Sequence, residues 1–249
     1  MSFTPPARRR IVLLRHGSVT YFDEQGKPQG SDFVPLNDNG RAQATAAGRA
    51  LSGLRFDKMV VSGLPRTVQT LECVQRESEH FEMRQMPYEV WPEWVEIKGG
   101  KLDEIAPHDA ERAMLSALNE GIPDASVSYQ GGETIAVFSA RVCGGIARLL
   151  ADPDWDQVLL VLHGGVNRVF LSHALTAGTT QQGTFFAGFQ QAPACINVLD
   201  VRRNDPHAWV LRTVNYNPTD LLHQRTRATT VEEGFTLYSR YLATLPTRS

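Results

Sequence analysis

The sequence predicts an α/β fold in which a mostly parallel central sheet lies between two layers of helices. Short runs of β-branched residues and leucine alternate along the chain with longer segments whose apolar residues recur at helical spacing. Two of the apolar runs, residues 11–14 and 158–162, lead into a histidine that a glycine follows. Because such uninterrupted runs are typical of parallel strands buried on both faces, we expect a three-layer α/β/α arrangement.

Strands are expected where an apolar run is short and closes at a glycine or a polar residue. Residues 58–61 carry such a run, and Ser62 and Gly63 close it. Two further runs lie near the end of the chain. The five predicted strands are residues 11–14, 58–61, 158–162, 196–201 and 209–214.

Helices are expected in the longer segments between these strands. Residues 40–51 are rich in alanine, and Pro65 stands where the first turn of a helix tolerates proline. Residues 134–150 place apolar side chains at roughly helical spacing. The four predicted helices are residues 40–51, 64–75, 134–150 and 166–175.

We interpret residues 1–249 as a single domain with two additions. Residues 98–132 interrupt the alternation with several glycines and prolines, and we treat them as an insertion with a short helix at about residues 109–119. The chain from about residue 219 is expected to be a tail with a helix at about residues 231–242. We expect the insertion and the tail to form a lid over the functional site.

Composition and charge exclude several classes of protein. Hydrophobic residues make up 42% of the chain and charged residues 21%, which is typical of a globular protein rather than a disordered one. The formal net charge of −2 gives no overall basic field, so we expect no nucleic-acid partner. An anionic ligand must therefore be held by a local cluster of positive charge.

The cysteines and the longest apolar runs indicate the cellular compartment in which the protein is expected. Cys73, Cys143 and Cys195 are odd in number and far apart, which argues against a disulfide framework or a zinc site and favours the reducing cytoplasm. No stretch approaches the ~20 apolar residues of a membrane span, so we expect no membrane contact. The apolar run 11–14, which follows three arginines, is too short for the core of a secretion signal.

Two arginines and two histidines stand where the predicted strands end. Arg15 and His16 follow the first strand, His163 follows the strand at residues 158–162, and Arg66 lies one turn into the helix after Gly63. Ligands of open α/β sheets bind at the carboxyl ends of the strands. If these strands are neighbours, guanidinium groups and helix N-termini converge there in a site suited to phosphate.

The charges of this cluster suggest a chemistry. Two nearby arginines disfavour a protonated imidazole, so His16 should remain neutral with a free nitrogen lone pair. A neutral imidazole beside a phosphoryl group is a nucleophile, and Arg15, Arg66 and His163 would stabilise the transferring group. A carboxylic acid should lie close by to protonate the leaving oxygen.

Beyond the strand ends, an ordered series of motifs resembles the histidine phosphatase superfamily, also called the phosphoglycerate mutase-like family. Arg15-His16-Gly17 looks like its RHG signature, and the likeness spans roughly residues 10–215. The other stretches similar to family motifs are residues 26–30, 35–44, 62–70, 131–134 with Arg141, and 162–168.

This resemblance implies a phosphoglycerate mutase-like fold and a role for each matching residue. His16 would be phosphorylated, and Arg15, Arg66, His163 and Gly164 would bind the phosphate. It implies neither a metal nor a cofactor.

The same family places its general acid on a glutamate with a glycine four positions on. Glu96 followed by Gly100 fits that register, so we choose Glu96 over Glu93. The non-catalytic alternative for Glu93 is a charged side chain that faces solvent.

The chain departs from the family where many members carry an asparagine that touches phosphate. Here the stretch after Ser18 holds Thr20, Tyr21 and Phe22 instead. Thr20 would supply the missing hydroxyl, and Tyr21 and Phe22 would shape a more apolar mouth for the substrate.

The short form of the second histidine motif favours a phosphatase that acts on a small phosphorylated substrate. A phosphoglycerate mutase-type phosphotransferase and a catalytically silent phosphate-binding module are the alternatives. The sequence leaves the oligomeric state open, with a homodimer among the options.

Overall fold

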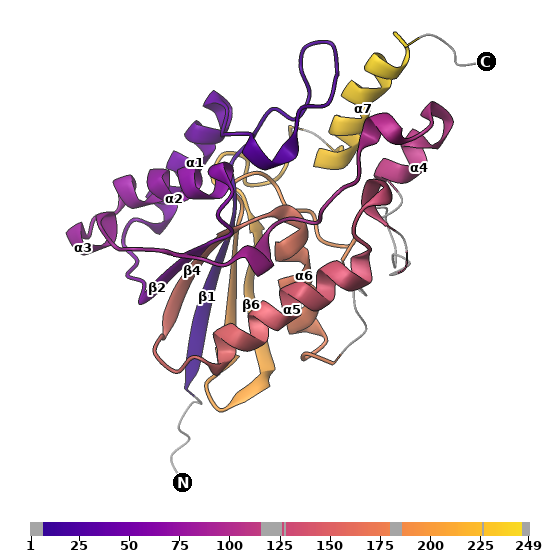
Figure 1. Cartoon of the computed structure of the whole chain (residues 1–249). Helices are drawn as coiled ribbons and strands as arrows, with labels where there is room; N and C mark the ends of the chain where they lie inside the picture. The colour runs from indigo at the N-terminus through magenta and orange to yellow at the C-terminus, as the bar shows by residue number, and fades with distance from the viewer. Residues whose placement is uncertain (1–6, 116–125, 127, 180–185, 226, 246–249) are drawn as a thin grey trace.

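The structure is a computed structural model of the 249-residue chain, and it describes residues 7–115, 126, 128–179, 186–225 and 227–245. Its centre is one sheet with the strand order β3-β2-β4-β1-β5-β6 (Figure 1). Pairing is parallel from β3 through β1, and β5 pairs antiparallel with both of its neighbours. The described strands are β1 Arg8–Arg15, β2 Lys58–Val61, β3 Glu89–Val90, β4 Gln157–Leu162, β5 Ile196–Arg202 and β6 Asp205–Tyr216.

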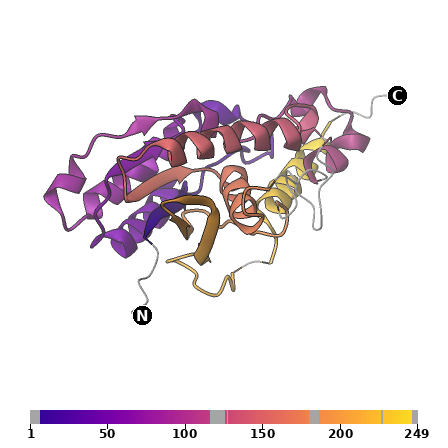
Figure 2. The same ribbon diagram turned by 90° about the horizontal axis from the view of Figure 1, so that it is seen from below.

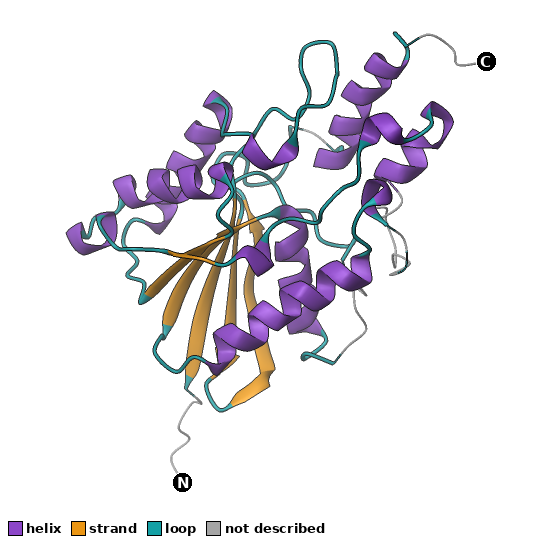
Figure 3. Ribbon diagram, viewed as in Figure 1, coloured by secondary structure: helices purple, strands orange, loops and turns teal. Residues whose placement is uncertain are grey.

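Helices cover both faces of this sheet, so the predicted α/β fold with a mostly parallel sheet between helical layers is confirmed (Figure 3). Helices α1, α2 and the short α3 lie on one side, and α5 and α6 lie on the other. The described α-helices are α1 Asp38–Leu51, α2 Pro65–Glu77, α3 Phe81–Arg84, α4 Ala110–Leu115, α5 Ile135–Ala151, α6 Gly164–Leu175 and α7 Thr230–Leu242.

Strand β1 shows why the apolar runs lack a polar alternation. Ile11 and Leu13 face the core under α5 and α6, whereas Val12 and Leu14 face the core under α1 and α2. All four side chains are at most 1% exposed. A strand with helices on both faces buries both sets of alternating side chains, which an uninterrupted apolar run requires.

The structure extends or adds elements where polar residues obscured the pattern. Strand β1 begins at Arg8, because Arg9 stacks 4.2 Å over the Trp155 ring and Arg10 forms an ion pair with Asp200. The two-residue edge strand β3 and the four-residue helix α3 are too short to leave a periodic signal. In the insertion, the predicted helix at about 109–119 is described as α4 up to Leu115, and its later residues lie outside the described part.

Helices α4 and α7 lie together beyond the end of the sheet at which the parallel strands finish (Figures 1 and 2). Ala110 and Met114 of α4 pack with Tyr238 of α7 in a small apolar cluster. The two additions that the sequence predicts, the insertion and the tail, therefore meet each other at the edge where His16 and His163 lie.

Candidate active site

Strand register brings the two histidines together. Strand β4 lies between β1 and β2, and Arg15 of β1 is paired with Leu162, the residue before His163. The rings of His16 and His163 are consequently 5.2 Å apart between centroids. His16 is 3% exposed and His163 is fully buried.

The hydrogen bonds of His16 leave one ring nitrogen for chemistry. Its Nδ1 lies 2.7 Å from the carbonyl oxygen of Gly17. Because a carbonyl oxygen only accepts, Nδ1 carries the hydrogen and Nε2 carries the lone pair. No described side chain or backbone group bonds to Nε2, so the lone pair of this atom is free.

Burial and positive charge keep His16 neutral. Burial is the largest cause that lowers the pKa of His16 well below its ordinary value, and the guanidinium groups of Arg66 and Arg15 lower it further. The bond to Gly17 opposes this only in part. The neutral imidazole, which is the form that can attack phosphorus, is therefore favoured across the neutral pH range.

The residue that follows β2 holds the ring of His163 by a hydrogen bond. Its Nε2 lies 2.7 Å from the hydroxyl of Ser62, the residue that follows the strand. Burial, then Arg66 and His16, lower the pKa of His163 well below its ordinary value. With the Ser62 hydroxyl donating to Nε2, the buried Nδ1, which has no bond partner within the described chain, carries a hydrogen that can be donated to a phosphate oxygen.

Arg15 is anchored on one side of its guanidinium group. Its Nη1 donates to the carbonyl oxygen of Gln191 and, over 3.1 Å, to the hydroxyl of Thr230 in the first turn of α7. Its Nε is buried without an acceptor among the described residues. A Cβ added at Gly164 would lie 3.3 Å from that Nε, so glycine leaves Arg15 its room beside the start of α6.

Arg66 and the turn after His16 are fixed by α2. Arg66 occupies the first turn of this helix and is 2% exposed. One turn later the hydroxyl of Thr70 accepts from the backbone N–H of Gly17, at 3.1 Å, and donates to the carbonyl of Arg66, at 2.7 Å. A Cβ at Gly17 would stand 2.3 Å from the Gly40 carbonyl oxygen, so only glycine fits between the turn after His16 and α1.

Glu96 reaches the same edge from the segment after β3. One carboxylate oxygen accepts from the backbone N–H of Gly165 at 2.9 Å, and the other accepts from the N–H of Ile97 at 3.0 Å. A Cβ at Gly165 would lie 2.3 Å from the carboxylate, so this glycine makes the contact with α6 possible. The carboxyl group thus stands at the N-terminus of the helix that follows His163.

The segment that carries Glu96 is held by a half-buried ion pair. Glu133 pairs with Arg141 at 2.7 Å and also accepts from the backbone N–H of Lys98 at 3.1 Å. Arg141 donates to the carbonyl oxygens of Glu93 and Val95, each at 2.8 Å. These contacts clamp the chain on either side of Glu96, which explains how a residue outside regular secondary structure is held in place.

Glu93, the rival candidate, is engaged elsewhere. Its carboxylate forms an ion pair with Arg148 of α5 at 2.7 Å. The structure therefore places Glu96, and not Glu93, beside Gly165.

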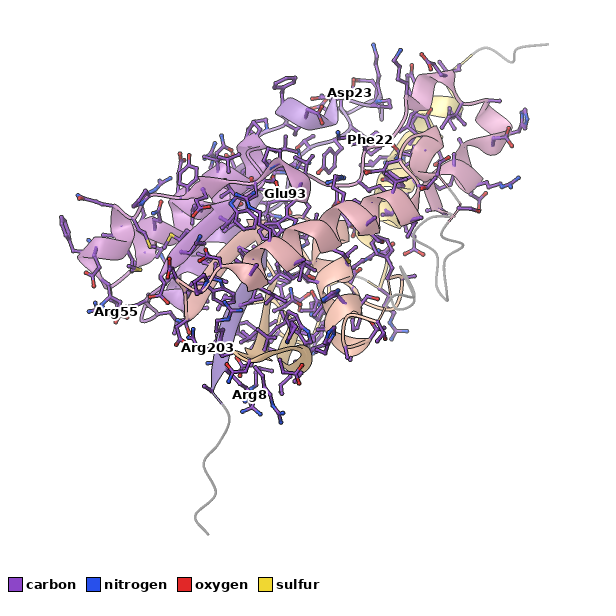
Figure 4. All side chains as sticks on the ribbon, turned by 60° about the horizontal axis from the view of Figure 1, so that its bottom comes forward. Arg8, Phe22, Asp23, Arg55, Glu93 and Arg203 are labelled. Atoms are coloured by element: carbon purple, nitrogen blue, oxygen red, sulfur yellow. The ribbon has the colours of Figure 1, made fainter. Side chains whose placement is uncertain are left out.

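The three expected substrate contacts divide between two places. The Tyr21 ring lies 5.8 Å from the Arg66 guanidinium and is beside the cluster. Phe22, which is labelled in Figure 4, packs instead against α7, with its ring 6.1 Å from that of Tyr238. Thr20 is exposed, and its hydroxyl accepts from the side chain of Asn37 at 3.3 Å, so it is not directed at the histidines.

Sequence reasoning assigned no role to Arg168, which follows Gly164 by one turn of α6. Arg168 is 7% exposed, and no hydrogen bond or ion pair to it occurs within the described chain. Burial, and then the positive charge of Arg15, lower the pKa of Arg168 to about 10, while Glu96 and Tyr129 act in the opposite direction. The guanidinium group lies 5.7 Å from the centre of the Phe186 ring. A buried guanidinium group that forms no ion pair is costly unless an anion joins it. Its only signal in the sequence was its position in the stretch 162–168.

The described residues offer neither a metal site nor a disulfide. No group of three or more His, Cys, Asp or Glu side chains is placed there to hold a metal ion. Cys73, Cys143 and Cys195 are free thiols. Among the described helices, none has both the length and the apolar character that crossing a membrane requires.

Known proteins share this arrangement. The family model described as histidine phosphatase superfamily (branch 1) matches residues 11–217. A zebrafish (Danio rerio) fructose-2,6-bisphosphatase TIGAR B is 31% identical over 132 residues, which are 53% of this chain and 49% of that protein. An Arabidopsis thaliana probable 2-carboxy-D-arabinitol-1-phosphatase is 28% identical over 231 residues, which are 88% of this chain and 44% of that protein.

A solved structure is similar over most of the chain. A mycobacterial glucosyl-3-phosphoglycerate phosphatase is similar with a TM-score of 0.63 at 25% identity, and the match covers 84% of this chain and 99% of that one. The chain spans about half the length of the two relatives from zebrafish and Arabidopsis.

Proposed function

This chain belongs to the histidine phosphatase superfamily, and from that membership we propose that it is a phosphomonoester hydrolase that works through a phosphohistidine on His16. The observation that carries the proposal is the state of His16. Its Nδ1 is committed to the Gly17 carbonyl, its Nε2 is free, and its pKa is held low by burial and by two arginines. Such an imidazole is a nucleophile placed next to a phosphate-binding cluster.

Two displacements at phosphorus complete the proposed reaction. In the first, His16 Nε2 attacks phosphorus, the bond to the leaving oxygen breaks, and Glu96 gives that oxygen a proton. In the second, the Glu96 carboxylate takes a proton from water, the water oxygen attacks phosphorus, and the P–N bond breaks with its electron pair returning to Nε2. Arg15, Arg66, His163 and the Gly164 backbone would hold the oxygens in both steps.

The substrate class is proposed from Arg168. Its guanidinium group is buried and forms no ion pair with a described side chain, which supports a small substrate that carries a second acidic group besides the phosphate ester. The names of three relatives agree with this class, because they specify a bisphosphate, a carboxylated sugar-alcohol phosphate and a glucosylated phosphoglycerate. Tyr21 and Phe22 would line the mouth, with Thr20 as an outer contact.

Replacement of Arg168 by methionine should reveal this second contact. We expect kcat/KM for 3-phosphoglycerate to fall by about tenfold to a hundredfold, because a charge-assisted contact is lost. For glycerol 3-phosphate, which lacks the carboxylate, the loss should be several times smaller. Steady-state kinetics on the two substrates test this, and equal losses on both would contradict a second acidic subsite.

The proposed hydrolysis is tested by phosphate release from a panel of small phosphate monoesters with EDTA present. We expect turnover to survive chelation. We also expect activity at about pH 5.5 to remain a large fraction of that at pH 7. The nucleophile is active when deprotonated, and a lowered pKa keeps it so at a pH where an exposed histidine is mostly protonated. Activity that vanished on chelation, or that fell through the ordinary histidine pKa, would contradict the proposal.

The same panel separates the alternatives. A phosphoglycerate mutase would interconvert phosphoglycerates without releasing phosphate, because it must keep water from the phosphohistidine. A silent binding module would bind phosphate and turn over nothing.

The position of α4 and α7 supports a further part of the proposal, namely that residues 98–132 and the tail form a lid on a single domain. Three free cysteines support a cytoplasmic location. A homodimer is the remaining expectation.

A further inference from the structure

The C-terminal helix α7 makes a direct contact with the phosphate-binding cluster. Arg15 Nη1 has two acceptors, the Gln191 carbonyl and the Thr230 hydroxyl, the second at 3.1 Å. Neither Nε nor Nη2 of Arg15 has an acceptor among the residues that the structure describes, and Nε is fully buried. The Nη1 corner of the planar guanidinium group is therefore held, while the edge formed by Nε and Nη2 is open.

The open edge is the one that suits phosphate. A guanidinium group binds phosphate most strongly through two parallel N–H groups of one edge. With Nη1 committed, the edge formed by Nε and Nη2 is the pair that remains. It lies beside Gly164, where α6 begins and where the backbone approaches Nε closely.

Helix α7 holds Thr230 in place through several contacts. Thr229 caps the helix in a capping box with Glu232, which fixes the first turn. Tyr238 is 1% exposed and its hydroxyl donates to the Leu102 carbonyl at 3.0 Å. A Cβ at Gly26 would lie 2.2 Å from the Leu237 carbonyl, so the loop after the nucleophile packs directly on the helix.

We propose that α7 is a working part of the phosphate site, in which the Thr230 hydroxyl positions Arg15 so that its Nε–Nη2 edge faces the phosphate. The proposal rests on the proposed function for the identity of the ligand. Thr230 lies outside residues 11–217, which match the family model, so this contact is an addition carried by the tail of this chain. Thr230 acts through Arg15 and is a positioning residue rather than a catalytic one.

Replacement of Thr230 by valine tests the proposal, because valine keeps the shape and removes the acceptor. We expect inorganic phosphate, used as the probe in calorimetry, to bind about tenfold more weakly. KM for a phosphate monoester should rise with it, and kcat should fall less. Thr230→Ser restores an acceptor and should bind phosphate within about twofold of wild type. The matched control is Thr236→Val, which removes a hydroxyl from an exposed position of the same helix.

A double-mutant comparison shows whether Thr230 acts through Arg15. Lysine in place of Arg15 has no Nε–Nη2 edge that Thr230 could position. In an Arg15→Lys background, Thr230→Val should therefore cause little further loss of phosphate affinity. Equal losses in both backgrounds, or a Thr230→Val protein that binds phosphate like wild type, would overturn the proposal. So would a wild-type protein that binds no phosphate. Because phosphate binding requires no turnover, an inactive protein that still showed the predicted pattern would contradict the proposed function alone.

Discussion

Replacement of His16 by alanine should abolish phosphate release. We expect kcat to fall by at least about 10⁴-fold, because the loss of a nucleophile removes the covalent route and leaves only binding and charge stabilisation. His16 is 3% exposed, and its Nε2 has a free lone pair beside Arg15 and Arg66. The nearby His163 cannot supply such a lone pair, because its Nε2 is bonded to the Ser62 hydroxyl and its Nδ1 carries the hydrogen. The measurement is turnover of p-nitrophenyl phosphate with EDTA present.

A trapping experiment makes this prediction specific. Wild-type protein mixed with a phosphate monoester and quenched in alkali should retain phosphate on a histidine, because phosphohistidine survives base, and His16→Ala should retain none. Circular dichroism and phosphate binding by the variant would show that it is folded. His80→Ala is a suitable control, since His80 is half-buried and hydrogen-bonded to the Gly53 carbonyl just after α1, and it makes no contact with the two arginines or with His16. Undiminished turnover by His16→Ala would contradict the proposed mechanism.

The features that the sequence predicts are those that follow from regular backbone structure. Five strands and the four helices that alternate with them are predictable, because their apolar patterns follow from burial on one or both faces. Arg15, His16 and His163 could be placed together without a structure, because each stands at a strand end and parallel strands finish at one edge. The order of strands supplied the remaining condition, with β4 between β1 and β2.

The remainder depends on side-chain packing that no periodic pattern encodes. Glu96 lies between elements, and only the resemblance distinguished it from Glu93. Its position is set by the ion pair of Glu133 and Arg141. These two residues are 35 or more positions along the chain from the backbone groups around Glu96 that they bind. Thr230 was missed because the docking of α7 depends on a small apolar cluster with α4.

Replacement of Glu96 by glutamine should have an effect that depends on the leaving group. For an alkyl phosphate, whose leaving oxygen is strongly basic, we expect a loss of about 10²–10⁴-fold, the range of general acid catalysis. For p-nitrophenyl phosphate the leaving group departs as an anion, so the first step should be nearly unaffected. Glutamine keeps an oxygen that can accept from Gly165, which should preserve the local fold.

The second step, hydrolysis of the phosphohistidine, gives a kinetic test that is specific to Glu96. Without a carboxylate to take the proton from water, the phosphohistidine should be hydrolysed slowly. Glu96→Gln mixed with p-nitrophenyl phosphate should therefore release about one nitrophenolate per chain in a burst and then turn over slowly. Glu93→Gln is the matched control, because that carboxylate is paired with Arg148 and should give neither a burst nor a dependence on the leaving group. If instead the Glu93 variant showed the burst and the Glu96 variant did not, the acid would be misassigned, and the contact with Gly165 would be structural.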